Sequence, residues 1–158
     1  MAAAPEPAPR LPGAVLFACN FNRVRSAMAE GLMKLMFGAQ VYVDSCGLRQ
    51  DEDGDAPDPF AVAVMSELGA DLSHHRPKTF DELEDDSFDL VISLTPEAQH
   101  RAVELGRSRA VDLEYWPTHD PTLDMGSREA VLEAYRETRD ALARRIVERF
   151  GKPMSVGG

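Results

Sequence analysis

The segment "AVLFACNFNRVRSAMAEGLMKLMFG", residues 14–38, decides the fold. It opens with a short apolar run, which is typical of a strand buried on both faces, and after a turn it continues with apolar residues at helical spacing. The pattern predicts a strand, a turn and a helix in that order. In an open α/β sheet this first turn is a preferred place for a ligand. A single thiol, Cys19, begins the turn, and Arg25 ends it.

The rest of the chain repeats the alternation of strands and helices. Short apolar runs predict further strands at 41–45, 88–94 and 109–113, and helices are expected at 58–69, 96–105 and 127–150. Asp58 as N-cap, Pro59 in the first turn and Gly69 at the end are strong signals for the second helix. The predicted fold is therefore α/β, a three-layer sandwich with a central four-stranded parallel sheet and helices on both faces.

The length of 158 residues indicates one domain, which we place at residues 14–150. Residues 1–13 contain four prolines and no apolar core, so they are predicted to be a disordered N-terminal tail. Residues 151–158 are expected to form a C-terminal tail. The N-terminal segment has the pattern of neither a signal peptide nor a membrane anchor.

Charge and cysteine content exclude several classes of partner. The net charge is −10, from 27 acidic against 17 basic side chains, which disfavours binding to nucleic acid or to an anionic membrane. No apolar stretch reaches the ~18 residues of a membrane span. Two cysteines make neither a disulfide framework nor a paired metal motif, so we expect a cytoplasmic protein without a metal. The oligomeric state is not indicated.

The turn after the first strand has the chemistry of an anion site. A helix N-terminus offers unpaired N–H groups and a partial positive charge, and neither glycine-rich nucleotide motif is present. Thiols in such a place beside an arginine ionise near neutral pH. Arg25 can offer a planar fork to two oxygens of a phosphate-like group, and the hydroxyl of Ser26 can donate to the thiolate. Cys19 is thus a candidate nucleophile, although an isolated cysteine is more often a buried apolar residue.

The sequence resembles a known family at this point. Cys19, five residues, Arg25 and Ser26, followed by "AMAE", are similar to the low-molecular-weight protein tyrosine phosphatases and the related arsenate reductases. The motifs "VDSCG" (43–47), "PDPFAV" (57–62), "FDLVISL" (88–94) and a late Asp-Pro extend the resemblance over residues 14–150. The resemblance implies a cysteine-dependent phosphomonoester hydrolase with a thiophosphate intermediate, acting on a phosphorylated protein or small molecule without a cofactor.

The resemblance also implies roles for individual residues. The catalytic residues would be Cys19 as nucleophile, Arg25 as phosphate clamp and Asp120 as general acid, with Asp124 as the competing acid. The substrate-binding loop would comprise Asn20, Phe21, Asn22, Arg23, Val24 and Ser26. Ser45 and His75 would support the loop from behind, with His74 as the alternative histidine.

The sequence departs from the family pattern in loops that normally select the substrate. Phe21 stands where glycine is usual, and Val24 replaces a second cysteine. The aromatic wall after the second strand is replaced by "LRQDEDGD" (48–55), although Phe21, Tyr115 or Trp116 can supply stacking area. The acids of this segment disfavour acidic phosphopeptides, and the missing wall argues against phosphotyrosine as the natural substrate.

Two other functions stay open. The same loop can bind arsenate, as in an arsenate reductase, but thiol-coupled reduction needs another cysteine, and only Cys46 or an external thiol is available. A non-catalytic phosphate-binding module would use the same loop without turnover.

Overall fold

The computed structural model describes residues 11–52, 54–84 and 87–153. Its strands are β1 (Ala14–Cys19), β2 (Tyr42–Gly47), β3 (Leu90–Ser93) and β4 (Asp112–Tyr115). Its α-helices are α1 (Arg25–Phe37), α2 (Pro59–Ser66), α3 (Pro96–Gly106) and α4 (Arg128–Phe150), with 3-10 helices η1 (Phe80–Glu82) and η2 (Pro121–Leu123). The sheet order is β2-β1-β3-β4 and every pairing is parallel.

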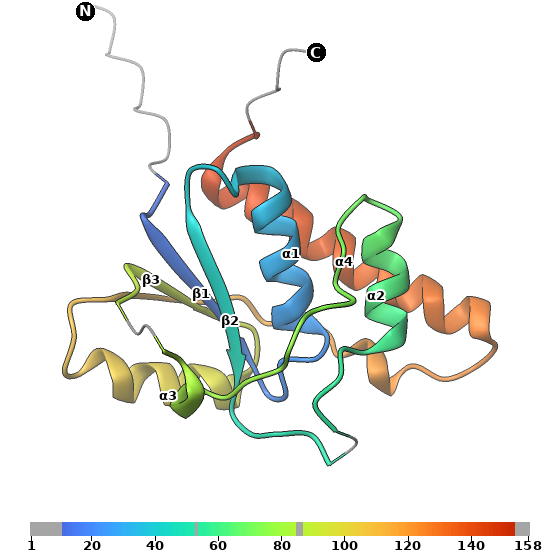
Figure 1. Ribbon diagram of the computed structural model, residues 1–158, viewed down its shortest axis with the longest axis horizontal. Helices are drawn as coiled ribbons and strands as arrows, with labels where there is room; N and C mark the ends of the chain where they lie inside the picture. Colours follow the sequence, from blue (N-terminus) through green and yellow to red (C-terminus); the bar gives the residue numbers. More distant parts are fainter. Residues whose placement is uncertain (1–10, 53, 85–86, 154–158) are drawn as a thin grey trace, which may run out of the picture.

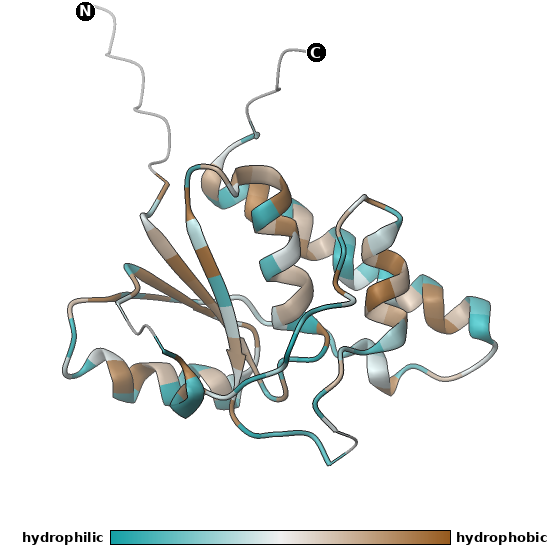
Figure 2. Cartoon of the chain, in the orientation of Figure 1, coloured by the Kyte–Doolittle hydropathy of each residue, from teal (hydrophilic) through white to brown (hydrophobic). Residues whose placement is uncertain are grey.

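The helices form a layer on each face of the sheet (Figure 1). Side chains alternate along β1, so Val15 and Phe17 pack in the core beneath α1, α2 and α4, whereas Leu16 and Ala18 pack in the core beneath α3. Apolar residues accordingly follow the strands and the inner faces of the helices (Figure 2). The predicted three-layer fold with a four-stranded parallel sheet is confirmed.

The second helix begins as the sequence predicts. The Asp58 side chain accepts hydrogen bonds from the N–H groups of Phe60 and Ala61, at 2.8 and 3.2 Å, and Pro59 occupies the first turn. The helix ends at Ser66, and Gly69 follows in a turn with φ of 83°. This cap places the carboxylate of Asp58 at the edge of the sheet where the strands end, beside the loop after β1.

The fourth strand begins three residues later and ends two residues later than predicted. Residues 109–111 form a tight turn, in which the N–H of Val111 donates to the carbonyl of Arg109 at 3.1 Å, and the pairing with β3 begins at Asp112. An apolar run alone does not show where the hydrogen-bonded register begins. The predicted tails at 1–13 and 151–158 fall largely outside the described residues.

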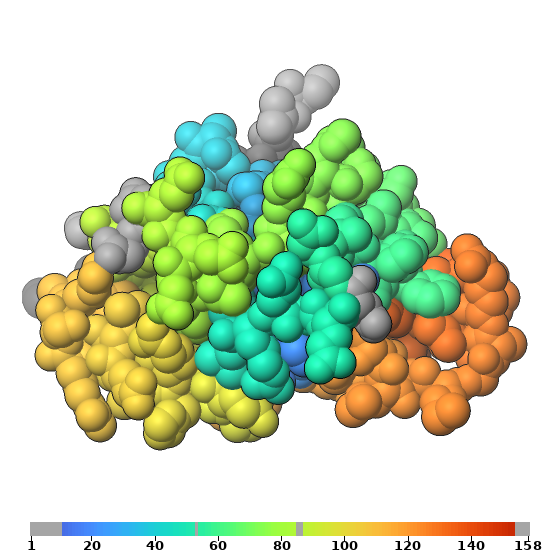
Figure 3. Space-filling model, turned by 60° about the horizontal axis from the view of Figure 1, so that its bottom comes forward, coloured from blue at the N-terminus to red at the C-terminus, as the bar shows by residue number. Residues whose placement is uncertain are grey.

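The connections after β1, β2 and β4 meet at the carboxyl edge of the sheet. Figure 3 views the molecule from this side: part of the loop after β1 shows between the segment after β2 and the segment before α4. Among the described residues, none of the helices combines the length and the apolar character needed to cross a membrane.

Candidate active site

The loop after β1 is held in its shape by Asn22. Asn22 has φ of 60°, which is uncommon for a residue other than glycine, and its side chain is fully buried. Its Nδ2 donates to Ser26 at 2.7 Å and to Ser45 at 2.8 Å, and its Oδ1 accepts from the N–H of Lys78 at 3.1 Å. Its carbonyl is 2.8 Å from Nε2 of His75. These contacts offset the cost of the left-handed backbone.

Gly47 lets the loop sit against the end of β2. A Cβ atom at this position would lie 2.8 Å from the carbonyl oxygen of Asn20 and 2.9 Å from the nitrogen of Asn22. The carbonyl of Asn20 also accepts from the N–H groups of Leu48 and Arg49. The glycine of the "VDSCG" motif is therefore needed because the two backbones approach closely.

Cys19 lies at the base of a pocket of about 450 Å³. The cysteine is only 3% exposed, and its Sγ is 2.9 Å from the hydroxyl of Ser26 and 3.4 Å from the N–H of Asn22. Val24 marks the end of the loop, and α1 begins at Arg25. The sulfur thus lies within hydrogen-bonding distance of a hydroxyl and a backbone amide, beside a helix N-terminus, which is a place that attracts an anion.

Arg25 connects the cysteine loop to the segment after β4. One of its guanidinium nitrogens donates to the carbonyl of Thr118 at 3.1 Å, and the other lies 3.6 Å from the carboxylate of Asp120. Asp120 caps η2 by accepting from the N–H and hydroxyl of Thr122. Asp124 also lines the pocket, but its carboxylate is 2.6 Å from His119. Both candidate acids therefore reach the pocket, and Asp120 is the one beside Arg25.

Aromatic side chains from α2 and α4 line the pocket, and the sequence interpretation missed them. The rings of Phe60 and Tyr135 lie 5.4 Å apart, and Val131 and Phe21 complete the apolar lining. Tyr135 is 2% exposed and also belongs to the buried core, so the pocket wall continues into the core here. A buried tyrosine on a helix needs a partner for its hydroxyl, and that signal was available in the sequence.

Tyr135 finds this partner in Asp58, to which it donates at 3.1 Å. Burial of the ring, followed by the nearby Asp58 carboxylate, raises the pKa of Tyr135, so the phenol stays protonated. The one hydroxyl hydrogen of Tyr135 is thus engaged by Asp58, and this bond joins α4 to the N-cap of α2.

Of the three aromatic residues offered as alternative stacking surface, Phe21 lines the cysteine pocket, and Tyr115 and Trp116 were the wrong alternatives. Neither lines the cysteine pocket, because Trp116 packs into the core with its ring 6.0 Å from that of Phe17 and 6.3 Å from that of Phe150. Tyr115 ends β4 and is 37% exposed.

Side-chain contacts connect the loop after β1 to the acidic segment after β2. Arg23 donates to the carboxylate of Asp51 at 3.0 Å and to the carbonyl of Ala56 at 2.9 Å. The guanidinium of Arg49 lies over the ring of Phe21, 5.1 Å from its centroid. The segment that replaces the family's aromatic wall thus folds over the loop and contributes a carboxylate to the pocket.

Cys46 is separated from Cys19 by the sheet. Cys46 pairs with Ala18 in the register and packs with it beneath α3, whereas Cys19 belongs to the core on the opposite face. Cys46 is fully buried, and burial, with the nearby Cys19 and Asp44 adding to it, raises the pKa of its thiol. The two free thiols thus lie on opposite faces of the sheet.

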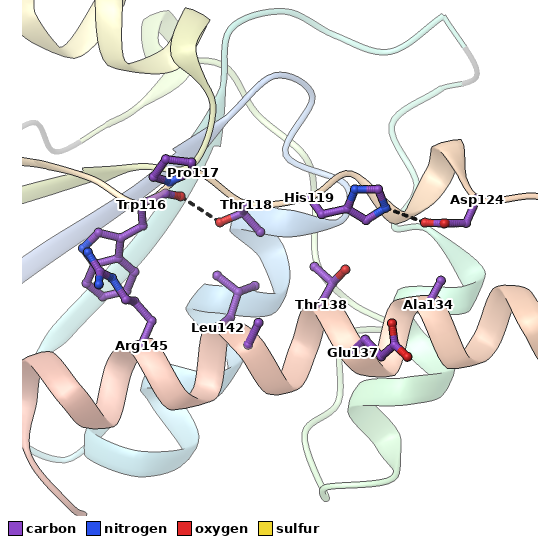
Figure 4. Close-up of a pocket in the computed structure, with 11 residues that line it drawn as sticks. Trp116, Pro117, Thr118, His119, Asp124, Ala134, Glu137, Thr138, Leu142 and Arg145 are labelled. Atoms are coloured by element: carbon purple, nitrogen blue, oxygen red, sulfur yellow. Dashed lines mark hydrogen bonds and ion pairs between the residues drawn. The ribbon is translucent and has the colours of Figure 1, made fainter.

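A second cavity, of about 470 Å³, lies between the segment after β4 and α4 (Figure 4). Its wall includes Trp116, Thr118, Leu142 and Arg145, with the guanidinium of Arg145 5.3 Å from the indole centroid. Asp124 borders both cavities. Within the described part of the chain, no three His, Cys, Asp or Glu side chains are grouped to hold a metal ion.

Known proteins with similar sequences include arsenate reductases. Arsenate reductase 1 of Staphylococcus epidermidis is 30% identical over 136 residues, which cover 84% of this chain and 96% of that protein. The glutaredoxin arsenate reductase of Synechocystis is 38% identical over 80 residues, 51% of this chain and 58% of that protein.

Solved structures with this fold include phosphatases. The low molecular weight protein tyrosine phosphatase from T. tengcongensis superposes with a TM-score of 0.70 at 27% identity, covering 86% of this chain and 98% of that one. The YwlE arginine phosphatase, solved with a phosphorylated active-site serine, has a TM-score of 0.67 at 27% identity, covering 83% and 89%.

A family model described as low molecular weight phosphotyrosine protein phosphatase matches residues 14–150. This range starts with β1, ends with α4 and includes the whole pocket. The chain belongs to the low molecular weight phosphotyrosine protein phosphatase family.

Proposed function

We propose that this protein is a cysteine-dependent phosphomonoester hydrolase, with Cys19 as nucleophile. The observation that carries the proposal is the position of the Cys19 sulfur at the base of the pocket, 2.9 Å from the Ser26 hydroxyl, with Arg25 and Asp120 on the same pocket. A phosphoryl group bound by the loop amides and Arg25 would have phosphorus next to this sulfur. The net reaction is phosphomonoester plus water to alcohol plus inorganic phosphate.

In the first step the Cys19 thiolate attacks phosphorus, and a sulfur–phosphorus bond forms while the bond to the leaving oxygen breaks. Protonated Asp120 gives its proton to that oxygen, so the product leaves as a neutral alcohol. The amides of residues 20–25 and the guanidinium of Arg25 stabilise the three equatorial oxygens, which carry the charge of the transition state.

In the second step water attacks phosphorus and the sulfur–phosphorus bond breaks. Asp120, now a carboxylate, takes the proton of the water, which restores the acid for the next turnover. The hydroxyl of Ser26, 2.9 Å from the sulfur, stabilises the departing thiolate. Every proton released in one step is used in the other, so no cofactor is required.

The pocket wall favours a flat leaving group. Phe60 and Phe21, which are partly exposed, supply aromatic surface in place of the missing family wall, so an aryl phosphate has rings to stack against. We therefore propose aryl phosphates as first test substrates, with the natural substrate drawn from phosphorylated proteins or small molecules.

A phosphorylated guanidinium is a second candidate substrate. Four carboxylates line the pocket, those of Asp51, Asp58, Asp120 and Asp124, and they favour a cationic leaving group over an acidic one. The similarity to the YwlE arginine phosphatase points to the same class. In this case the bond broken is phosphorus to nitrogen, and Asp120 would protonate the nitrogen.

The test is hydrolysis of p-nitrophenyl phosphate, phosphotyrosine and phosphoarginine by the native protein and by Cys19→Ser. The proposal expects turnover of at least one substrate and its loss in Cys19→Ser. Phosphate binding without turnover of any of them would instead favour a non-catalytic module. Arsenate reduction supported by glutathione or thioredoxin, with no phosphate release from any substrate, would favour the reductase named among the relatives.

A further inference from the structure

Glu30, on α1, is joined to the nucleophile by a continuous chain of hydrogen bonds. Its carboxylate accepts from the hydroxyl of Ser45. Ser45 accepts in turn from Nδ2 of Asn22 at 2.8 Å, and the same nitrogen donates to Ser26 at 2.7 Å. The Ser26 hydroxyl is 2.9 Å from the Cys19 sulfur.

The donors and acceptors along this chain can be assigned. A carboxylate only accepts, so Ser45 must spend its one hydrogen on Glu30 and can only accept from Asn22. The Oδ1 of Asn22 accepts from the N–H of Lys78, which fixes the amide with its two hydrogens toward Ser45 and Ser26. Ser26 is thereby an acceptor from Asn22, and its own hydrogen is left for the Cys19 sulfur, with the carbonyl of Cys46 as a more distant acceptor at 3.3 Å.

Glu30 anchors the outer end of this chain. Asn22, Ser26 and Ser45 are fully buried, whereas the Glu30 side chain is 13% exposed and forms an ion pair with Lys34, which is 53% exposed. A second charged pair lies nearby: Nζ of Lys78 is 2.6 Å from the carboxylate of Asp44, the residue that precedes Ser45 in the sequence. An ionised acceptor at the end of a buried chain strengthens each bond along it.

We propose that Glu30 is a positioning residue: by accepting from Ser45 it fixes the Asn22 amide and makes Ser26 a hydrogen-bond donor to the Cys19 thiolate. The proposal rests on the proposed function for its effect on turnover, but its effect on thiol reactivity does not depend on the substrate. In the part of the chain that the structure describes, Glu30 is the side chain that accepts from the Ser45 hydroxyl.

The test compares Glu30→Gln, which keeps an oxygen acceptor, with Glu30→Met, which removes it at similar length. The measurements are the rate of Cys19 alkylation by iodoacetamide against pH, the kcat and KM for p-nitrophenyl phosphate, and the Tm. In Glu30→Met we expect alkylation at pH 6 and kcat to fall about 3- to 10-fold, the size of one lost hydrogen bond, with KM little changed. The alkylation profile should move to higher pH. Glu30→Gln should recover most of both losses.

Two further variants control for charge and for folding. Lys34→Met removes the exposed partner of Glu30 and should leave alkylation and kcat within about twofold of the native values. Ser45→Ala breaks the chain one bond further in and should reproduce the alkylation change of Glu30→Met. The double variant, which combines Glu30→Met with Ser45→Ala, should slow alkylation no more than either single substitution, because both interrupt the same chain of hydrogen bonds.

Native alkylation rates in both Glu30→Met and Ser45→Ala would overturn the proposal. So would equal losses in Glu30→Gln and Glu30→Met, which would assign the effect to the charge, or a lower Tm with an unchanged alkylation profile. If Glu30→Met does not fold, Ser45→Ala alone decides. Absence of turnover on every phosphate would refute the proposed function and leave the alkylation test valid.

Discussion

The guanidinium of Arg25 and the carboxylate of Asp120 lie 3.6 Å apart, across the boundary between the cysteine loop and the segment after β4. Arg25 also donates to the carbonyl of Thr118 in that segment. The proposed phosphate clamp and the proposed acid are therefore neighbours, so a phosphoryl group held by Arg25 would bring its leaving oxygen toward Asp120. Asp124, which pairs with His119, has no such link to Arg25.

The first prediction separates the two acids. Asp120→Asn should lower kcat about 10²- to 10⁴-fold for a substrate with a poor leaving group, because the leaving oxygen loses its proton donor. The loss should be much smaller for p-nitrophenyl phosphate, whose leaving group needs little protonation. Asp124→Asn serves as the matched control and should show no such dependence on the leaving group. The assignment is wrong if the dependence follows Asp124 instead.

The second prediction concerns the two thiols. Because burial raises the pKa of Cys46, it stays protonated and should not react with iodoacetamide in the folded protein. We expect mass spectrometry to find a single alkylated cysteine, Cys19, under native conditions and two after unfolding in guanidinium. A disulfide between Cys19 and Cys46 after mild oxidation, found by peptide mapping, would contradict the separation of the thiols by the sheet.

The third prediction tests the close approach at Gly47. Gly47→Ala places a Cβ atom 2.8 Å from the backbone of the cysteine loop, so the loop must shift. We expect a loss of about 1–3 kcal/mol in the free energy of unfolding, together with much weaker binding of inorganic phosphate by calorimetry. The control is Gly106→Ala at the end of α3, where the nearest atoms to the added one belong to side chains, those of Leu113 at 3.2 Å and Val111 at 3.8 Å. Equal phosphate affinity in both variants would count against this role of Gly47.

The fourth prediction is a pH dependence of stability at the α2–α4 contact. Glu67 accepts hydrogen bonds from Arg136 and Arg139 on α4, and these bonds lower its pKa below the ordinary value. A lowered folded-state pKa stabilises the protein above the ordinary pKa of the carboxyl, and this stabilisation is lost as the pH falls through the folded-state value.

Glu67→Gln should therefore lower the Tm at pH 7, and the difference from the native protein should shrink as the pH falls below about 4. Thermal unfolding, followed by circular dichroism at each pH, measures this difference in Tm. Glu148→Gln is the control, because that carboxylate faces only Arg145 at 3.9 Å on the same helix. A Tm difference that is constant with pH would show that the Glu67 carboxylate is not the group responsible.

The sequence predicts the sheet and the cysteine loop well because local patterns determine them. Apolar runs bounded by a turn predict buried strands, and the spacing of Cys19 and Arg25 matches the wrapping of one loop around an anion. Asn22 and Gly47 also follow local rules, since each stands where the backbone is unusual or crowded. The family motifs, which place Ser45 and His75 near Asn22, agree with the contacts observed.

The pocket wall was not predictable in the same way. Phe60 and Tyr135 come from two helices far apart in the sequence, and which side of an apolar stripe meets the pocket depends on how α2 packs on α4. The sequence left the position of Trp116 open for the same reason, because its burial depends on Phe17 and Phe150. The link from Glu30 to Ser45 joins a helix and a strand, and nothing in either motif alone indicates it.

The most direct test of the account is to trap the covalent intermediate. The native protein is incubated with p-nitrophenyl phosphate and quenched in acid, and the peptides are analysed by mass spectrometry. The account predicts one phosphoryl group on the peptide that contains Cys19, in Asp120→Asn as well as in the native protein, and none on that peptide in Cys19→Ala. Steady release of phosphate with no adduct on Cys19, and undiminished release in Cys19→Ala, would contradict it.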